Sequence, residues 1–357
     1  MKLEVFYLLV FHSFLILTAS VWMLKLYMGK LYSTLPALTF DDVLIRPSSS
    51  NIEPSEANLK SAICCGIFLN LPFLSAAMDK VTETEMAINV AKLGGLGVLH
   101  RNCSIEEQIK MVVEVKAKKQ IIGAACGPFD IKRAIALDKA GCDIVFVDCA
   151  HGHNQKVIKS AKEIKNKLKK AKLVVGNIAT KEAAKSLVSF ADGIKVGVGP
   201  GSICTTRVVS GVGVPQLAAI MEVAEVANKY NVPVIADGGI RTSGDVAKAL
   251  AAGASAVMLG NLLAGTNESP GKIITKGNKK YKEYRGMGSK SVLSSGVSKD
   301  RYLQKGKDNI PEGVEALVEY KGGVEPIIKS MSSGVRIAMG YVGVKDIKQL
   351  HKKYGNI

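Results

Sequence analysis

The sequence predicts a (β/α)₈ barrel, and three observations support this. Eight short apolar runs alternate along the chain with amphipathic stretches of helical spacing, the order of a parallel sheet covered by helices. No G-x-G-x-x-G motif follows any of the runs, which argues against a doubly wound dinucleotide-binding sheet. The 357 residues, 47% of them hydrophobic, are enough for one large barrel and exclude a disordered, collagen-like or disulfide-scaffold chain.

The predicted strands are short and apolar because parallel barrel strands are buried on both faces. They cover residues 71–76, 96–99, 121–125, 144–147, 173–175, 193–196, 233–236 and 256–259. Between them, the spacing of apolar residues predicts helices that include residues 84–93, 105–118, 155–170 and 215–230.

Two segments interrupt this alternation. Residues 197–214 are rich in glycine and lie between the sixth strand and its helix, and residues 269–323 form a long polar insertion after the eighth strand. Both follow the carboxyl ends of strands, where barrels place their chemistry, and loops of this length are usually lids or binding loops. We therefore expect one catalytic barrel over residues 38–357, with an active-site loop at 197–214 and a flap at 269–323.

Residues 1–37 form an N-terminal extension that is apolar and uncharged from residue 5 to residue 24. A run of this length can span a bilayer or act as the apolar part of a signal sequence. The other interpretation is a dispensable extension, with Met23 or Met28 as alternative starts. Because nothing downstream reads as secreted, we expect a cytoplasmic protein.

The composition favours anionic partners and free thiols. Lys and Arg outnumber Asp and Glu by 48 to 31, a formal charge of +17 that suits phosphates, nucleic acid or membrane surfaces. The lysine run at residues 156–172 is typical of the solvated face of a barrel helix, and aromatic residues that would stack on bases are missing nearby. Seven cysteines without a C-x-x-C spacing indicate a reducing compartment.

Candidate ligand-binding turns follow the seventh and eighth predicted strands. Asp237-Gly238-Gly239 and Gly260-Asn261 stand at the corner where many barrels bind phosphate through backbone N–H groups and a helix N-terminus. The simpler interpretation is ordinary turn chemistry, but both turns fall on these two strands. We predict a phosphate site here, with Asp237 accepting hydrogen bonds from ribose hydroxyls.

Cys204 is the candidate nucleophile, because it lies in the glycine- and hydroxyl-rich loop 199–207 at the predicted active face. Cys126, Cys142 and Cys149 are interpreted as buried fillers. His151 and His153 are spaced like two metal ligands. A metal-dependent hydrolase site needs more ligands than these two, and the sequence does not supply them.

Several motifs resemble the inosine-5′-monophosphate (IMP) dehydrogenase family, from about residue 38 to residue 343. They occur in one order along the chain, which makes the resemblance specific. The motifs lie at residues 38–44, 75–79, 199–206, 236–241 and 284–289 and read LTFDDVL, SAAMD, GPGSICTT, ADGGIR and YRGMGS.

The resemblance implies oxidation of IMP to XMP with NAD, the committed step towards guanine nucleotides. Cys204 would attack C2 of the base, and water would hydrolyse the resulting thioimidate, activated by Arg301 beside Tyr302 and facing Thr206. By the same resemblance, Asp237 would bind the ribose. The residues that would bind the base are Met287, Gly288 and Glu312, and those that would bind the phosphate are Ser202, Gly239, Gly260, Asn261 and Tyr284. Asp148, Asn177 and Gly197 would line the nicotinamide side, and the carbonyls of Gly199, Gly201 and Cys204 match a K⁺ site.

The sequence also departs from this family. Serine is usual where Asn261 and Cys149 stand, and the sequence ends at Ile357, before the segment with which a neighbouring subunit completes the K⁺ site, which leaves K⁺ dependence open. The family usually inserts a two-CBS regulatory module before the third strand, but residues 115–120 run directly into it. We therefore expect no nucleotide regulation through such a module, and, from the family, a homotetramer.

Three other functions remain as alternatives. GMP reductase shares the barrel, the cysteine loop and the missing module, but Ile240-Arg241 stands where reductases tend to have cysteine, and residues 284–289 and Arg301-Tyr302 fit the dehydrogenase. An FMN-dependent oxidoreductase on a similar barrel would be yellow when purified. A phosphate-binding barrel without enzymatic activity would retain RNA through its charge and show no turnover.

Overall fold

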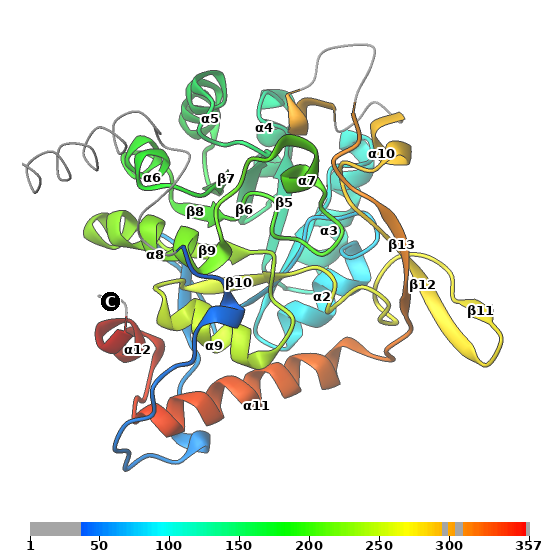
Figure 1. Cartoon of the computed structure of the whole chain (residues 1–357). Helices are drawn as coiled ribbons and strands as arrows, with labels where there is room; N and C mark the ends of the chain where they lie inside the picture. Colours follow the sequence, from blue (N-terminus) through cyan, green and yellow to red (C-terminus); the bar gives the residue numbers. More distant parts are fainter. Residues whose placement is uncertain (1–36, 295–298, 304–309, 355–357) are drawn as a thin grey trace, which may run out of the picture. The chain divides into compact units, whose positions relative to one another are not determined.

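Eight of the described strands close into a parallel barrel, as the sequence predicts (Figure 1). The computed structural model describes residues 37–294, 299–303 and 310–354, and the described residues from Leu38 onward form one compact unit. The barrel closes where β10 pairs with β3, with Val257 opposite Phe73. The barrel strands are β3 (Phe73–Ser75), β4 (Leu96–Leu99), β5 (Ile122–Cys126), β6 (Ile144–Asp148), β7 (Lys172–Ile178), β8 (Gly193–Val196), β9 (Val234–Asp237) and β10 (Ala256–Leu259).

A ring of helices covers the outside of the barrel (Figure 1). Ser104 starts α3 through a capping box, in which its hydroxyl accepts from the Glu107 amide at 3.0 Å and its own amide donates to the Glu107 carboxylate at 2.8 Å. Helix α5 turns its apolar residues to the barrel and most of its lysines to solvent. The ring comprises α2 (Thr84–Lys92), α3 (Ile105–Ala117), α4 (Ile131–Lys139), α5 (Gln155–Lys167), α6 (Lys181–Leu187), α8 (Gln216–Ala227), α9 (Ser243–Ala251) and α11 (Val324–Val342), which is followed by α12 (Ile347–Tyr354).

The core has two layers. Inside the barrel, side chains such as Leu74, Phe146 and Met258 fill the space between the strands, so the barrel is packed and is not a pore. Between barrel and helices, a larger apolar layer includes Val112, Ile164 and Leu250. Burial of these layers supplies the main driving force for folding.

A hairpin that the sequence analysis did not predict precedes the barrel. Strands β1 (Ser61–Cys64) and β2 (Ile67–Leu69) are antiparallel. The Cys65 amide donates to the carbonyl of Asp192 at 2.7 Å, just before β8 begins, and Ile63 joins the apolar interior of the barrel. The hairpin therefore packs at the amino ends of the strands, and the carboxyl ends are left for the site.

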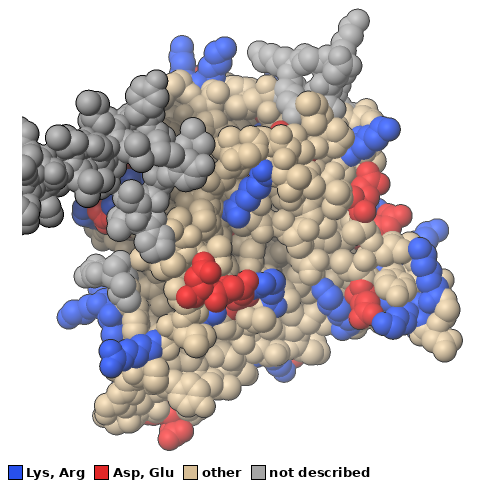
Figure 2. Space-filling view, viewed as in Figure 1, with Lys and Arg blue, Asp and Glu red and all other residues tan. Residues whose placement is uncertain are grey.

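The insertion after the eighth strand contains a second sheet. Strands β11 (Ile274–Lys276), β12 (Lys279–Arg285) and β13 (Glu315–Glu319) form an antiparallel sheet that projects from the barrel (Figure 1), and basic side chains gather along its β11–β12 hairpin (Figure 2). Between β12 and β13 lie α10 (Lys290–Ser294) and the 3₁₀ helix η5 (Lys299–Tyr302). The sequence predicted a polar flap over residues 269–323 but did not predict this sheet.

Two further sequence expectations concern segments at the edges of the barrel. Only residues 118–121 connect α3 to β5, so no domain is inserted between the second helix and the third barrel strand. The apolar run at residues 5–24 lies outside the described residues. Within the described ranges, no helix is both long and apolar enough to cross a membrane.

Candidate active site

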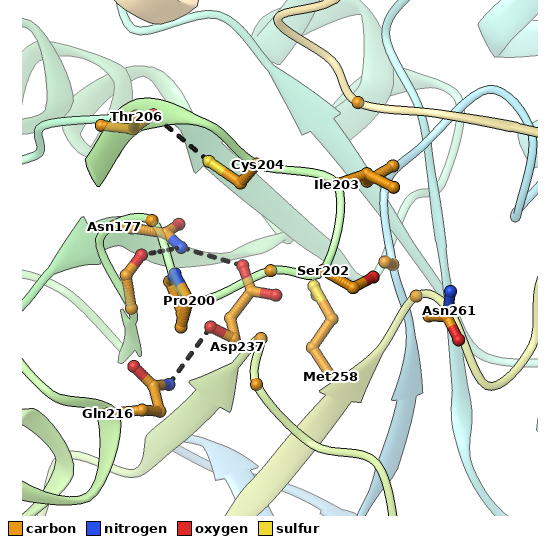
Figure 3. Close-up of a pocket in the computed structure, with 18 of the residues that line it drawn as sticks. Asn177, Pro200, Ser202, Ile203, Cys204, Thr206, Gln216, Asp237, Met258 and Asn261 are labelled. Carbon is orange, nitrogen blue, oxygen red and sulfur yellow. Dashed lines mark hydrogen bonds between the residues drawn. The ribbon is translucent and has the colours of Figure 1, made fainter. Parts of the chain in front are cut away.

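A cavity of about 450 Å³ opens at the carboxyl ends of the barrel strands, beneath the flap (Figures 2 and 3). All of the site residues named from the sequence line it, except Gly288, which lies directly under Tyr302: a Cβ on Gly288 would be 2.6 Å from the Tyr302 ring. The lining residues that the sequence named are Asp148, Asn177, Gly197, Gly199, Gly201, Ser202, Cys204, Thr206, Asp237, Gly239, Gly260, Asn261, Tyr284, Met287, Arg301, Tyr302 and Glu312.

Cys204 lies between β8 and the short helix α7 (Thr206–Ser210), with its sulfur above the cavity (Figure 3). Its thiol donates to the Thr206 hydroxyl at 3.2 Å, and that hydroxyl donates to the Glu312 carboxylate at 2.7 Å. Backbone pairing of Cys204 with Gly313 and of the Thr205 amide with the Glu312 carbonyl holds the loop against the flap. The sequence placed these three side chains in one site, and the structure adds that a hydrogen-bonded path joins them.

Lys195 on β8 is the main site residue that sequence reasoning missed. Its side chain is 3% exposed, and its ammonium lies 3.0 Å from the Asp148 carboxylate and 2.6 Å from that of Asp237, and also contacts Asn177. Burying these charges is tolerable only because they are paired. The signal was present in the sequence: Lys195 is the one charged residue in the strand Gly193–Val196.

The residues assigned to the nicotinamide side come from three consecutive strands. Asp148 ends β6, Asn177 lies on β7, and Gly197 follows β8. The Asn177 amide donates to the Gly197 carbonyl at 2.7 Å and to the Asp237 carboxylate at 2.9 Å (Figure 3). A Cβ on Gly197 would be 2.1 Å from the Asp237 carbonyl oxygen, so only glycine fits at this position.

The 3₁₀ helix η5 places Arg301 and Tyr302 over this side of the cavity. The Arg301 guanidinium is ion-paired with Asp148. The backbone carbonyl of Arg301 accepts from the Ala150 amide at 2.9 Å. Burial disfavours the charged guanidinium and lowers the pKa of Arg301, whereas the contact with Asp148 favours the charged form. Burial likewise raises the pKa of the Tyr302 phenol, and the Arg301 charge opposes that shift. Arg301 is therefore ion-paired with Asp148, the carboxylate that we expected on the nicotinamide side.

The residues predicted to bind phosphate lie on two turns, on the cysteine loop and on the flap sheet. Gly238 and Gly239 have φ values of +93° and +78°, which other residues rarely adopt, and the turn packs on Pro200 of the cysteine loop. Ser202 and Asn261 lie on the same side of the cavity (Figure 3). Tyr284 reaches this side from β12, and a Cβ on Gly260 would be 2.9 Å from the Tyr284 hydroxyl. Burial raises the pKa of the Tyr284 phenol, so it remains a hydrogen-bond donor.

Other candidates from the sequence lie apart from this chemistry. The His151 and His153 rings are 6.4 Å apart, and the described residues contain no group of three or more His, Cys, Asp or Glu side chains placed to hold a metal. Cys126, Cys142 and Cys149 are buried, and burial raises the pKa of the first two thiols to about 12 and that of Cys149 to about 11. They are therefore poor nucleophiles.

Comparison with known proteins gives a consistent result. Residues 37–356 match the family model of the IMP dehydrogenase / GMP reductase domain. The chain is 44% identical to the inosine-5′-monophosphate dehydrogenase of Borreliella burgdorferi, over 89% of this chain and 92% of the relative. It is 43% identical to that of Cryptosporidium parvum (88% and 90% covered) and 39% identical to that of Methanocaldococcus jannaschii (92% and 94% covered). The last alignment spans 465 positions, more than this chain contains, so that relative carries residues that this chain lacks.

Proposed function

Because the chain belongs to the IMP dehydrogenase / GMP reductase family, we propose that it oxidises IMP to XMP with NAD, through a covalent bond to Cys204. The observation that carries this proposal is the path from Cys204 through Thr206 to Glu312 at the edge of the cavity. A thiol needs to lose its proton to become a nucleophile, and this path gives the proton a carboxylate acceptor.

The chemistry proceeds in two stages. The Cys204 thiolate adds to C2 of the hypoxanthine ring, and a hydride then leaves C2 for NAD, which yields a thioimidate between Cys204 and the base. In the second stage, water adds to C2, the C2–S bond breaks, and the sulfur recovers a proton as XMP leaves. The products are XMP, NADH and one proton, and the second stage needs a group that orients water.

IMP would be held mainly through its phosphate and ribose. Ser202, Gly239, Gly260, Asn261 and Tyr284 supply N–H and hydroxyl donors for a dianion, and Asp237 accepts from ribose hydroxyls. Met287 and Glu312 would contact the base, and Gly288 leaves space for the Tyr302 ring packed against it. Asn261 keeps a polar side chain where the family usually has serine, and the Lys321 ammonium donates to the backbone carbonyl of Asn261 at 2.5 Å.

The residues on the other side of the cavity fit the nicotinamide end of NAD, which supplies the hydride acceptor. Gly197 lines the cavity at a position where the Asp237 carbonyl excludes any Cβ, and Asn177 and Asp148 line the cavity with it as polar side chains. The same Asp148 holds Arg301 in this structure. We therefore propose that η5 takes the nicotinamide position once NADH has left, and that Arg301 then orients water while Thr206 relays its proton.

We propose a K⁺ site at the backbone carbonyls of Gly199, Gly201 and Cys204, from the family resemblance. Carbonyl oxygens are suitable K⁺ ligands, but that of Gly201 already accepts from the Cys204 amide at 3.1 Å. A dependence on K⁺ would appear as higher turnover in KCl than in LiCl of equal ionic strength.

Cellular location and assembly are proposed on separate grounds. All seven cysteines are free thiols, which supports the cytoplasm as the compartment. We propose a homotetramer because the resemblance to the family implies one, and the exposed side chains of Val208 (85%) and Tyr341 (70%) are available to be covered in such an assembly. Light scattering coupled to size-exclusion chromatography would measure its mass.

A spectrophotometric assay tests the activity itself. We expect absorbance from NADH to rise when IMP and NAD are added to the purified protein. Consumption of NADPH with GMP, and no NADH from IMP, would instead assign the chain to the reductase branch of the same family.

A further inference from the structure

Arg207 lies within the cysteine loop and joins its two ends. It is the second residue of α7, and its side chain folds back towards the neck of the loop, by which we mean Val198 and Val214 at its two ends. The guanidinium Nε donates to the Val198 carbonyl at 3.0 Å, and one of its terminal nitrogens donates to the Val214 carbonyl at 2.6 Å. Val198 follows the end of β8 closely, and Val214 comes just before α8. One side chain therefore holds both ends of the loop that carries Cys204.

The space for Arg207 is provided by two glycines. A Cβ on Gly199 would lie 2.8 Å from the Arg207 Cγ, and a Cβ on Gly213 would lie 2.8 Å from its Nε. Gly199 also has a φ of +73°, in the region that favours glycine. The Arg207 side chain thus lies between the two segments of the loop that contain Gly199 and Gly213.

The charge of Arg207 is directed at carbonyl oxygens and not at a carboxylate. Among the described residues, no Asp or Glu oxygen lies within ion-pair distance of its guanidinium. In this partly buried site, two carbonyl oxygens accept from two nitrogens of the planar Arg207 guanidinium. A lysine ammonium, on a flexible side chain, would not place two donors in the same geometry.

The loop has a second attachment at its tip. The Val314 amide donates to the Ile203 carbonyl, and the Thr205 amide donates to the Glu312 carbonyl, both at 3.0 Å. This attachment depends on the flap, whereas the Arg207 attachment lies entirely within the loop. Arg207 therefore joins the two ends of the loop through contacts that do not involve the flap.

Resting on the proposed chemistry of Cys204, we propose that Arg207 is a positioning residue that clamps the neck of loop 197–214 and so fixes the Cys204 sulfur over the base. A small displacement of a reacting atom is costly, on the order of 10²-fold for 1 Å. Loss of the clamp should therefore slow formation of the covalent bond. Binding of IMP should change little, because Ser202 is the only one of the proposed phosphate and ribose contacts that lies in this loop.

Rapid-mixing kinetics on Arg207→Ala and Arg207→Lys test the clamp, with Lys159→Ala as a control that removes one exposed charge on α5. We expect the rate constant of the NADH burst to fall by about tenfold or more in both Arg207 variants, with less than about a twofold change in half-saturating IMP. Methylguanidinium should restore part of the rate in Arg207→Ala, and methylammonium at the same concentration should not. A burst rate within twofold of the parent in both variants would overturn the proposal.

Hydrogen exchange gives a readout that needs no turnover. Amides of residues 199–213 should exchange faster in both Arg207 variants, and added methylguanidinium should slow them again in Arg207→Ala. Arg207→Lys preserves charge and most of the bulk, so it still tests the clamp if Arg207→Ala does not fold. Unchanged exchange in the loop would overturn the clamp even if activity fell. If the parent protein forms no NADH from IMP, the proposed function fails, but the exchange result still decides the clamp.

Discussion

Cys204 differs from the other cysteines in what surrounds its sulfur. Cys126 and Cys142 are enclosed by apolar side chains, whereas the Cys204 thiol faces the cavity and donates to Thr206. The sequence pointed to Cys204 through the small and hydroxyl residues around it. The backbone pairing with residues 312–314 that holds the cysteine in place involves a segment more than a hundred residues away, so local pattern could not predict it.

Replacing Cys204 tests its role as the nucleophile. We expect Cys204→Ala to bind IMP with nearly unchanged affinity, because the phosphate and ribose contacts remain, and to release no NADH even in a single turnover. Calorimetry measures the binding, and stopped-flow absorbance measures the NADH. Cys65→Ala, at the other end of the barrel, is the matched control and should behave like the parent. A surviving NADH burst in Cys204→Ala would mean that another group forms the bond.

Arg301 should separate the two stages of the reaction. Arg301→Ala should leave the burst at close to one NADH per active site and slow the steady state by about 10²-fold or more, because Arg301 acts only in the water step. Mass spectrometry should then detect the accumulated adduct. Arg46→Ala removes an arginine remote from the cavity and serves as the control. A burst and a steady state that fall together would place Arg301 in binding or folding instead.

At the scale of elements, the flap sheet is tied to the barrel by a buried ion pair. Asp79, in the turn after β3, is 6% exposed and pairs with Arg285 at the end of β12, and also accepts from Asn102 at 2.7 Å. Burial alone would raise the pKa of Asp79, but the Arg285 and Asn102 contacts outweigh it and lower the pKa below its ordinary value. The pair thereby positions Tyr284 and Met287, which flank Arg285 and line the cavity.

This pair should stabilise the protein in a pH-dependent way. Because the pKa of Asp79 is lower in the folded state, the stabilisation is present above the ordinary pKa of about 4 and is lost as pH falls below it. We expect Asp79→Asn to reduce the free energy of unfolding by about 3 kcal/mol at pH 7, since it leaves Arg285 partly buried without its partner. Urea denaturation at pH 7 and pH 3 measures the difference, which should shrink at pH 3.

Asp41→Asn is the control, because Asp41 and Arg241 form an ion pair at an exposed position. Exposed pairs contribute little to stability, so this variant should unfold like the parent. An Asp79→Asn effect that is no larger than the Asp41→Asn effect, or that is equal at both pH values, would contradict the assigned role.

The elements also show where sequence reasoning succeeds. Each barrel strand was predictable because burial on both faces leaves a short apolar run. The β11–β12 hairpin was not predicted, because the strand residues next to its turn are exposed and include several lysines. Gly277-Asn278 is nevertheless a two-residue hairpin turn that signals it. The β1–β2 hairpin was also missed, since its strands are of only three or four residues and their buried side chains pack against the barrel.

At the scale of the whole molecule, the barrel from Leu38 onward should be sufficient for activity. The described compact unit starts at Leu38 and the family match starts at residue 37. We expect a chain that begins at Met28 to be soluble and as active as the full chain, because all of the site residues lie within that unit. Sedimentation and the NADH assay check this. Loss of folding on truncation, or recovery of the full chain in membranes, would show that residues 1–27 have a role of their own.

The account as a whole depends on a covalent bond between Cys204 and the base, and trapping that bond tests it most directly. The protein is mixed with IMP and NAD, quenched in acid within the first turnover, digested and analysed by mass spectrometry. We predict an adduct of XMP mass, less one water, on the peptide that contains Cys204, in an amount that matches the NADH formed in the burst. NADH formed without any adduct on that peptide, at every quench time and also in Arg301→Ala, would contradict the mechanism.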